Sequence, residues 1–105
     1  MTRVIRPPVV LSLAVSLVSA VCFAQSSGQA TYKAKCQMCH GATGTPSAGM
    51  AKMMSIKPVS DPAVKALTAD QMFTAVKNGK GKMKPVTGLT DRQIKDAVTF
   101  YRGLK

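Results

Sequence analysis

The stretch Cys36-Gln37-Met38-Cys39-His40 decides how the rest of this chain folds. It places two thiols close together in the chain and an imidazole directly after the second thiol. The segment that leads into it, residues 28–35, contains no Pro and no β-branched run. Gly28, Tyr32 and Cys36 recur every four residues, which puts them on one face of a helix. We therefore expect both thiols at the end of that helix, facing the same side.

A Cys-x-x-Cys-His string is the attachment signature of c-type haem. The thiols of Cys36 and Cys39 can add across the two vinyl groups of one haem, and His40 can then reach the iron. A zinc site would need a fourth ligand, and residues 25–105 contain no other His or Cys. A thioredoxin-like pair would need a preceding strand, and a disulfide would close only a tiny loop. The sequence predicts one covalent haem c per chain.

The first 24 residues have the pattern of a secretory signal peptide. Two arginines precede an almost wholly apolar stretch, residues 9–21, and Cys22 and Ala24 are small residues at the positions that signal peptidase reads. The alternative is an uncleaved anchor, which would need about 20 apolar residues, and this stretch is shorter and interrupted by serines. We expect cleavage after Ala24, a periplasmic location, and a single domain formed by residues 25–105.

The exported domain is strongly basic. The full chain has 15 Lys and Arg against 4 Asp and Glu, and the predicted leader carries two of the basic residues and no acid. The remainder has a net charge of about +9, which favours an acidic partner or, at most, peripheral contact with a membrane surface. Export and the small number of aromatic residues argue against a nucleic-acid partner.

Three helix starts follow from capping chemistry. Asp61-Pro62 reads as an N-cap with Pro at the first helical position, opening a short helix to about Ala66. Thr68-Ala69-Asp70-Gln71 and Thr90-Asp91-Arg92-Gln93 are capping boxes. The last helix then carries an apolar face made of Ile94, Ala97, Val98 and Tyr101.

Between the haem motif and these helices, residues 41–60 are rich in Gly, Pro, Ser and Thr. This composition predicts a long loop with at most one short turn of helix. No alternating strand pattern occurs in residues 25–105. The predicted fold class is all-α with long loops.

A second axial ligand for the iron must come from elsewhere, and a Met thioether is suitable because His40 is the only histidine. Met72 lies on the apolar stripe of a predicted helix and is expected in the core. Met38 lies inside the attachment loop. Three more methionines are expected to line the porphyrin as adaptable apolar groups: Met50, Met53 and Met54.

Met83 has a different context, in the loop Gly79-Lys80-Gly81-Lys82-Met83-Lys84-Pro85. Two glycines let the backbone approach the ring closely, and Pro85 limits its freedom. A lone apolar side chain among lysines has no obvious core to fill. We expect Met83 to be the second iron ligand, the alternative being a surface methionine on a solvated loop.

These residues together resemble the class I monohaem cytochromes c in their short bacterial form, over nearly all of residues 25–105. Gly28 and Tyr32 match the Gly and aromatic of the family's first helix, and residues 36–40 match its haem motif. Residues 78–83 look like its methionine loop, and residues 94–101 are similar to its last helix, which crosses the first. The resemblance implies a small cytochrome c fold of three to five short helices around one haem, with His40 and Met83 as axial ligands.

The implied function is that of a periplasmic electron carrier rather than an enzyme. With His40 and Met83 on the iron, no substrate can bind there, and the carrier is expected to be a monomer. Lysines near both ligand segments are expected to dock an acidic redox partner, such as a reductase, an oxidase or a dehydrogenase: Lys33, Lys35, Lys77, Lys80, Lys82 and Lys84.

Two alternatives remain at this point. One is an electron-transfer subunit of a larger dehydrogenase or oxidase complex. The other is a haem enzyme or gas sensor with an open iron. It is disfavoured because a peroxidase-like site needs a nearby acid-base group, and the only arginines of the exported domain, Arg92 and Arg102, lie on the last helix.

Overall fold

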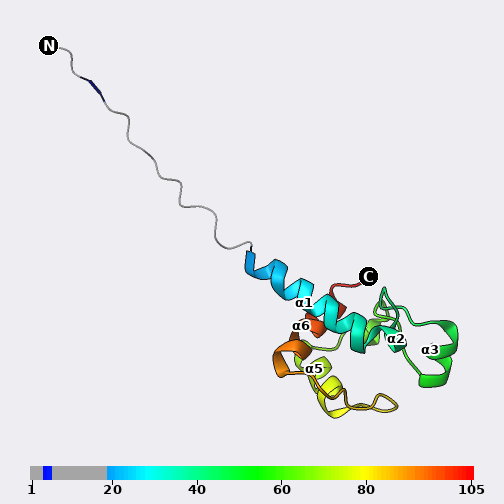
Figure 1. Cartoon of the computed structure of the whole chain (residues 1–105). Helices are drawn as coiled ribbons and strands as arrows, with labels where there is room; N and C mark the ends of the chain where they lie inside the picture. The colour runs from blue at the N-terminus through cyan, green and yellow to red at the C-terminus, as the bar shows by residue number, and fades with distance from the viewer. Residues whose placement is uncertain (1–3, 6–18) are drawn as a thin grey trace.

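A computed structural model of the chain describes residues 4, 5 and 19–105 (Figure 1). This part holds six helices and no strand, so the predicted all-α class is confirmed, with one helix more than the three to five expected. Most of the predicted leader lies outside the described residues, and a cut after Ala24 would fall within the first helix. No helix of the described part is long and apolar enough to cross a membrane. The helices are α1 (Ser19–Lys35), α2 (Gln37–His40), α3 (Ala48–Met54), α4 (Pro62–Lys65), α5 (Ala69–Asn78) and α6 (Asp91–Arg102).

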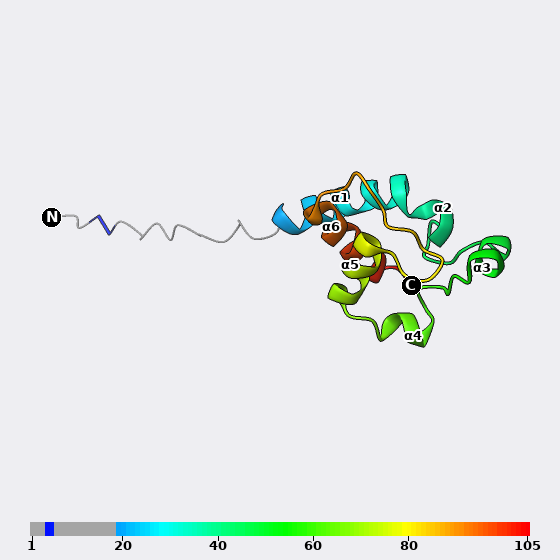
Figure 2. The same cartoon turned by 90° about the horizontal axis from the view of Figure 1, so that it is seen from below.

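Helices α1 and α6, which are far apart in the sequence, cross each other closely (Figures 1 and 2). Gly28 makes the crossing possible, because a side chain there would collide with the backbone carbonyl of Asp96. One turn further along α1, the ring of Tyr32 lies 5.2 Å from that of Phe100 and 6.0 Å from that of Tyr101. The predicted pairing of the first and last helices is therefore present, and it is packed through glycine and aromatic rings.

Helix α5 packs against α6 around a small core of Met72, Ile94 and Val98. Each of these side chains is less than 9% exposed, and burying one stabilises the fold by about 1.5–3 kcal/mol. Both predicted capping boxes are present: Thr68 and Thr90 accept from the third backbone N–H of their helices, which begin where the sequence indicates. The prediction that Met72 belongs to the core is confirmed.

The segment 41–60 is more ordered than its composition suggests. It contains α3, a helix of seven residues, where we expected at most one short turn. The Ser47 side chain accepts a hydrogen bond from the Met50 N–H at 3.3 Å, and Ser55 ends the helix in a left-handed conformation. Ser47 thus supplies the N-cap, and Ala, Met and Lys are good helix formers, so local capping prevails over the loop-like composition.

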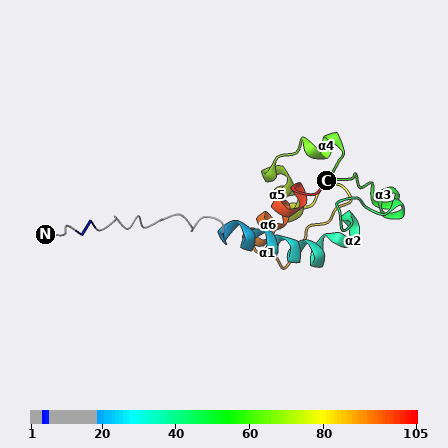
Figure 3. The same cartoon turned by 90° about the horizontal axis from the view of Figure 1, so that it is seen from above.

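Helix α4 begins as predicted, with the Asp61 carboxylate accepting from the Ala63 N–H at 2.8 Å and Pro at the first turn. Figures 2 and 3 show α4 on the far side of α5 from α1. The loop that follows α5 extends toward the side of the molecule that carries α2 and α3 (Figures 1 and 2). The haem motif and the methionine loop are thus presented on the same side of the helical core.

Candidate haem-attachment site

The haem motif forms a nearly continuous extension of α1. The Cys36 N–H still bonds to the Tyr32 carbonyl at 2.9 Å, but the φ of −118° at Cys36 separates α1 from α2. The His40 N–H then bonds to the Cys36 carbonyl at 3.0 Å. The five residues of the motif therefore have a defined helical geometry, as expected from their place at the end of the first helix.

Cys36 and Cys39 are both half-buried and carry free thiols. Burial raises the pKa of the Cys36 thiol, and the nearby Cys39 raises it further. Among the residues that the structure describes, no group of three or more His, Cys, Asp or Glu is gathered to hold a metal ion. The two thiols are thus not gathered into a zinc site, and they remain available for addition to the vinyl groups of one haem.

His40 has the environment of a neutral ligand. Its ring lies 5.5 Å from that of Tyr101 in an edge-on arrangement, and burial lowers the pKa of the imidazole. The neutral form is the one that can donate a lone pair to iron. Nδ1 is buried without a hydrogen-bond partner among the described residues. A buried polar atom of this kind calls for an explanation, and a site built to hold a bound group is one.

The residue after His40 is fixed by hydrogen bonds. The Tyr32 hydroxyl donates to the Gly41 carbonyl oxygen at 2.6 Å, and the Gly41 N–H donates to the Gln37 carbonyl at 2.8 Å. Gly41 has a φ of +83°, and a Cβ at this position would collide with the Thr45 carbonyl. Only glycine fits this turn, so the chain leaves the motif in one defined direction.

Met83 lies in a turn closed by two reciprocal backbone hydrogen bonds with Lys80, each 2.9 Å long. The Val86 N–H bonds to the Val76 carbonyl at 2.9 Å and so ties the end of the loop to α5. The Lys82 ammonium donates to the carbonyl of Met53, in the last turn of α3, at 3.1 Å. The side chain of Met83 is half-buried. The loop is thus held at both of its ends and at its middle.

The remaining methionines differ in burial. Met50 and Met54 are half-buried on α3, while Met53 is 62% exposed and Met38 is 86% exposed. The prediction that all three α3 methionines form apolar lining therefore fits Met50 and Met54 better than Met53. Met83 is the half-buried methionine that is held in a closed turn.

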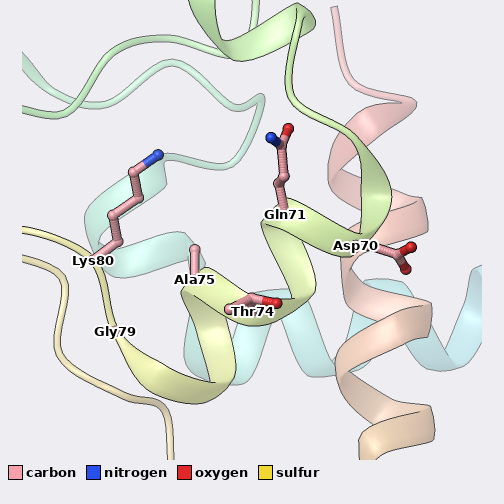
Figure 4. A pocket seen from close by; sticks show the side chains of 6 residues that line it. All are labelled: Asp70, Gln71, Thr74, Ala75, Gly79 and Lys80. Carbon is pink, nitrogen blue, oxygen red and sulfur yellow. The ribbon is translucent and has the colours of Figure 1, made fainter.

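A shallow open depression lies along one side of α5 (Figure 4). None of Cys36, Cys39, His40 and Met83 takes part in its lining. The Gln71 side chain is already used in the capping box of α5. The depression thus has no predicted haem ligand in its lining. It is lined by Asp70, Gln71, Thr74, Ala75, Gly79 and Lys80.

The six lysines predicted to surround the site are all exposed, but they are not equivalent. Lys77 pairs with Asp91 at 2.8 Å and lies over the ring of Phe73, so it links α5 to α6. The Lys82 ammonium donates a hydrogen bond to the carbonyl of Met53. The side chains of Lys80 and Lys84 have no partner in the described part of the chain. Sequence reasoning missed this division, because lysine partners depend on which segments meet in space.

Sequence reasoning also missed the hydroxyl of Tyr32 as part of the site. The helical spacing of Tyr32 and Cys36 placed its ring on the correct face, but no local signal linked the hydroxyl to Gly41. The glycine directly after the motif was the available hint, since a required positive φ often marks a special turn.

Comparison with solved structures indicates the class of protein to which this fold belongs. The solved structure of the "KustC0563 c-type cytochrome" is 25% identical, with a TM-score of 0.66, and the match covers 74% of this chain and 96% of that one. A mutant of Kustc0563 with Phe in place of a Tyr is 22% identical, with a TM-score of 0.65, covering 75% and 99%. The fold is that of a small c-type cytochrome.

The family described as "Cytochrome C oxidase, cbb3-type, subunit III" matches residues 23–100. The chain belongs to this family of cytochrome c domains. Comparison with curated protein sequences gives no match. A c-type cytochrome domain carries covalent haem c and transfers electrons, and such domains are in general electron carriers rather than enzymes. The two half-buried thiols and the half-buried imidazole of the motif fit this group.

Proposed function

We propose that this protein is a periplasmic carrier of single electrons, with one haem c bound through Cys36 and Cys39. His40 and Met83 are the two axial ligands of the iron. The observation that carries the proposal is the haem motif itself: two half-buried thiols and a half-buried imidazole lie within one helical extension of α1. The haem supplies the reversible one-electron couple when it is bound.

The residues of this chain define what the iron can do. His40 and Met83 together fill both axial positions, so substrates are excluded and the protein does not act as an enzyme. A Met thioether favours the reduced iron and raises the reduction potential. The hydrogen-bonded turn around Met83 supports this assignment, because a defined backbone presents one side chain in one direction. The edge-on ring of Tyr101 shields His40 from water on one side.

The proposed partner is an acidic redox protein, reached by a monomeric carrier. Exposed lysines lie on both ligand segments, and the exported domain has few acids to balance them. Lys80 and Lys84, whose ammonium groups have no partner among the described residues, are the best candidates for docking. Complementary charge of this kind increases the rate of encounter more than it increases affinity.

Export is part of the same proposal. We place signal-peptide cleavage after Ala24 and the mature protein in the periplasm. The contacts of α1 with α6 support a cut at this position, because Ser27, Gly28 and Tyr32 all follow it. Cleavage would therefore shorten α1 without removing these contacts.

A second candidate is an electron-transfer subunit held permanently in a larger oxidase or dehydrogenase. The observation that favours it is the name of the family, which describes a subunit of a cbb3-type cytochrome c oxidase. Size-exclusion chromatography of native periplasmic extract distinguishes the two. A free carrier elutes at the size of the small domain, and a subunit elutes with its complex.

Absorption spectra of the exported protein, oxidised and reduced, test the ligands. We expect the spectrum of a six-coordinate c-type haem, with the methionine-to-iron charge-transfer band in the oxidised form. Rapid binding of carbon monoxide to the reduced protein, without that band, would instead show an open iron and would refute the proposed carrier.

A further inference from the structure

Tyr32 carries a polar group that its packing role does not require. It is the largest fully buried side chain among the described residues, 1% exposed, and its ring packs against Phe100 and Tyr101. A phenylalanine would fill the same space. The hydroxyl, however, reaches the carbonyl oxygen of Gly41 at 2.6 Å, a short and buried hydrogen bond. This bond joins α1 to the residue that directly follows the proposed iron ligand.

The other donor to this carbonyl within the described residues is the N–H of Gly44, at the longer distance of 3.3 Å. The Tyr32 hydroxyl is therefore the main partner of the Gly41 oxygen. The N–H of Gly41 is bonded to Gln37, and its α-carbon faces the Thr45 carbonyl so closely that no side chain fits. The peptide after His40 is thus held by several contacts, and the hydroxyl supplies the one that comes from α1.

Tyr101 provides the contrast within the same aromatic cluster. Its ring lies 6.0 Å from that of Tyr32 and contacts the edge of His40 at 5.5 Å. No hydrogen bond is formed by its hydroxyl in the described part of the chain. Both tyrosines therefore pack beside the ligand segment, but only Tyr32 has a polar tie to its backbone.

We propose that the hydroxyl of Tyr32 is a positioning group for His40: by holding the Gly41 carbonyl, it fixes how the imidazole is presented to the iron. This inference rests on the proposed function, in which His40 is an axial ligand. Burial and the nearby Tyr101 raise the pKa of Tyr32 to about 12. The hydroxyl consequently keeps its proton at neutral pH and remains a donor.

Two consequences follow for the haem protein. Loss of the hydroxyl frees the backbone after His40, so the ring can rotate about its bond to the chain. Loss also leaves the partial negative charge of the Gly41 oxygen less neutralised near the iron, which favours the ferric state. A hydrogen bond contributes about 0.5–1.5 kcal/mol, so we expect the equilibrium constant for reduction to fall by roughly three- to tenfold.

The test uses the haem-loaded protein with Tyr32→Phe, and Tyr101→Phe as its matched control. Both changes remove one hydroxyl from the same cluster and keep the ring. Electron paramagnetic resonance of the ferric protein reports ligand orientation through its g values, and a redox titration gives the reduction equilibrium. We expect Tyr32→Phe to shift the g values and lower the reduction constant, and Tyr101→Phe to match the wild type in both.

Two results would overturn the inference while leaving the proposed function intact. In the first, Tyr32→Phe lowers the thermal midpoint but leaves the g values and the reduction constant unchanged, so the hydroxyl serves stability alone. In the second, both variants shift the potential equally, so the effect comes from cluster polarity and not from the Gly41 bond. A wild-type protein without haem on Cys36 and Cys39 would refute the proposed function and the inference together.

Discussion

The chain around His40 is held by packed aromatic side chains, whereas the chain around Met83 is held by backbone hydrogen bonds at the surface. On the histidine side, the Tyr32 hydroxyl bonds to the Gly41 carbonyl, and the rings of α6 pack against Tyr32 and His40. On the methionine side, the turn between Lys80 and Met83 is closed by backbone hydrogen bonds, and within the described residues the side-chain bond that holds it runs from Lys82 to α3. A packed segment is more stable than an exposed loop, so of the two proposed ligands Met83 should be the one that opens first.

The histidine side depends on the crossing of α1 and α6, which Gly28→Ala should break. The added Cβ would meet the Asp96 carbonyl, and overpacking of this kind costs about 1–3 kcal/mol. Gly49→Ala is the control, because a Cβ there meets nothing within 4 Å and alanine favours α3 by about 0.5–1 kcal/mol. Chemical denaturation of the haem protein measures the free energy of unfolding of each variant. Equal stability of the two variants would mean that the crossing is not tightly packed.

On the methionine side, Met83→Ala should open the sixth position of the iron. We expect a lower reduction potential and rapid binding of cyanide to the ferric protein, because a Met thioether raises the potential and blocks access. The same substitution at Met50 or Met54 should leave the methionine-to-iron band in place. If the band survives in Met83→Ala, then another methionine is the ligand.

Docking to a redox partner should depend on the exposed loop that carries Met83. Lys80→Glu should slow electron transfer to an acidic partner by up to roughly thirtyfold at low salt, since it turns an attraction of about 1 kcal/mol between unit charges at about 4 Å in water into an equal repulsion. The effect should fade as ionic strength rises past 0.1 M, where charges are screened beyond about 10 Å. Stopped-flow rates across a salt series measure it, with Lys105→Glu as the control. Rates that change neither with ionic strength nor with the substitution of Lys80 would show that docking is apolar.

The smallest expected effect concerns the side-chain hydrogen bond that links the methionine loop to α3. Lys82→Met removes the hydrogen bond to the Met53 carbonyl, and an exposed interaction of this kind contributes below about 1 kcal/mol. Cyanide should then displace Met83 roughly twofold faster, because the loop opens more often. Lys84→Met removes the same charge without removing a bond and should leave the rate unchanged. A similar acceleration in both variants would assign the effect to charge.

Local signals in the sequence were enough for much of the fold. The caps at Asp61, Thr68 and Thr90 are encoded within a few neighbouring residues, and the helix starts were predicted correctly from them. The pairing of α1 with α6 followed from the resemblance to the class I cytochromes c, in which the last helix crosses the first. Helix α3 was missed because Gly, Pro and Ser dominate its surroundings and hide the N-cap at Ser47.

The contacts that shape the site could not be predicted from local signals. The bond from Tyr32 to Gly41 depends on how α1 bends at Cys36, and the bond from Lys82 to Met53 joins residues 29 positions apart. Both are set by the final arrangement of the helices. The motif at residues 36–40 was sufficient to predict the cofactor, but not the groups that orient its ligands.

The most direct test of the central claim is the intact mass of the protein exported by a host that matures c-type cytochromes. After denaturation and acid-acetone extraction, we expect the mass of residues 25–105 plus one haem, with the haem on the peptide that contains Cys36 and Cys39. A mass that includes residues 1–24 would change only the predicted cleavage. A colourless polypeptide, with its haem removed by extraction, would contradict covalent attachment and with it the assignment of the site.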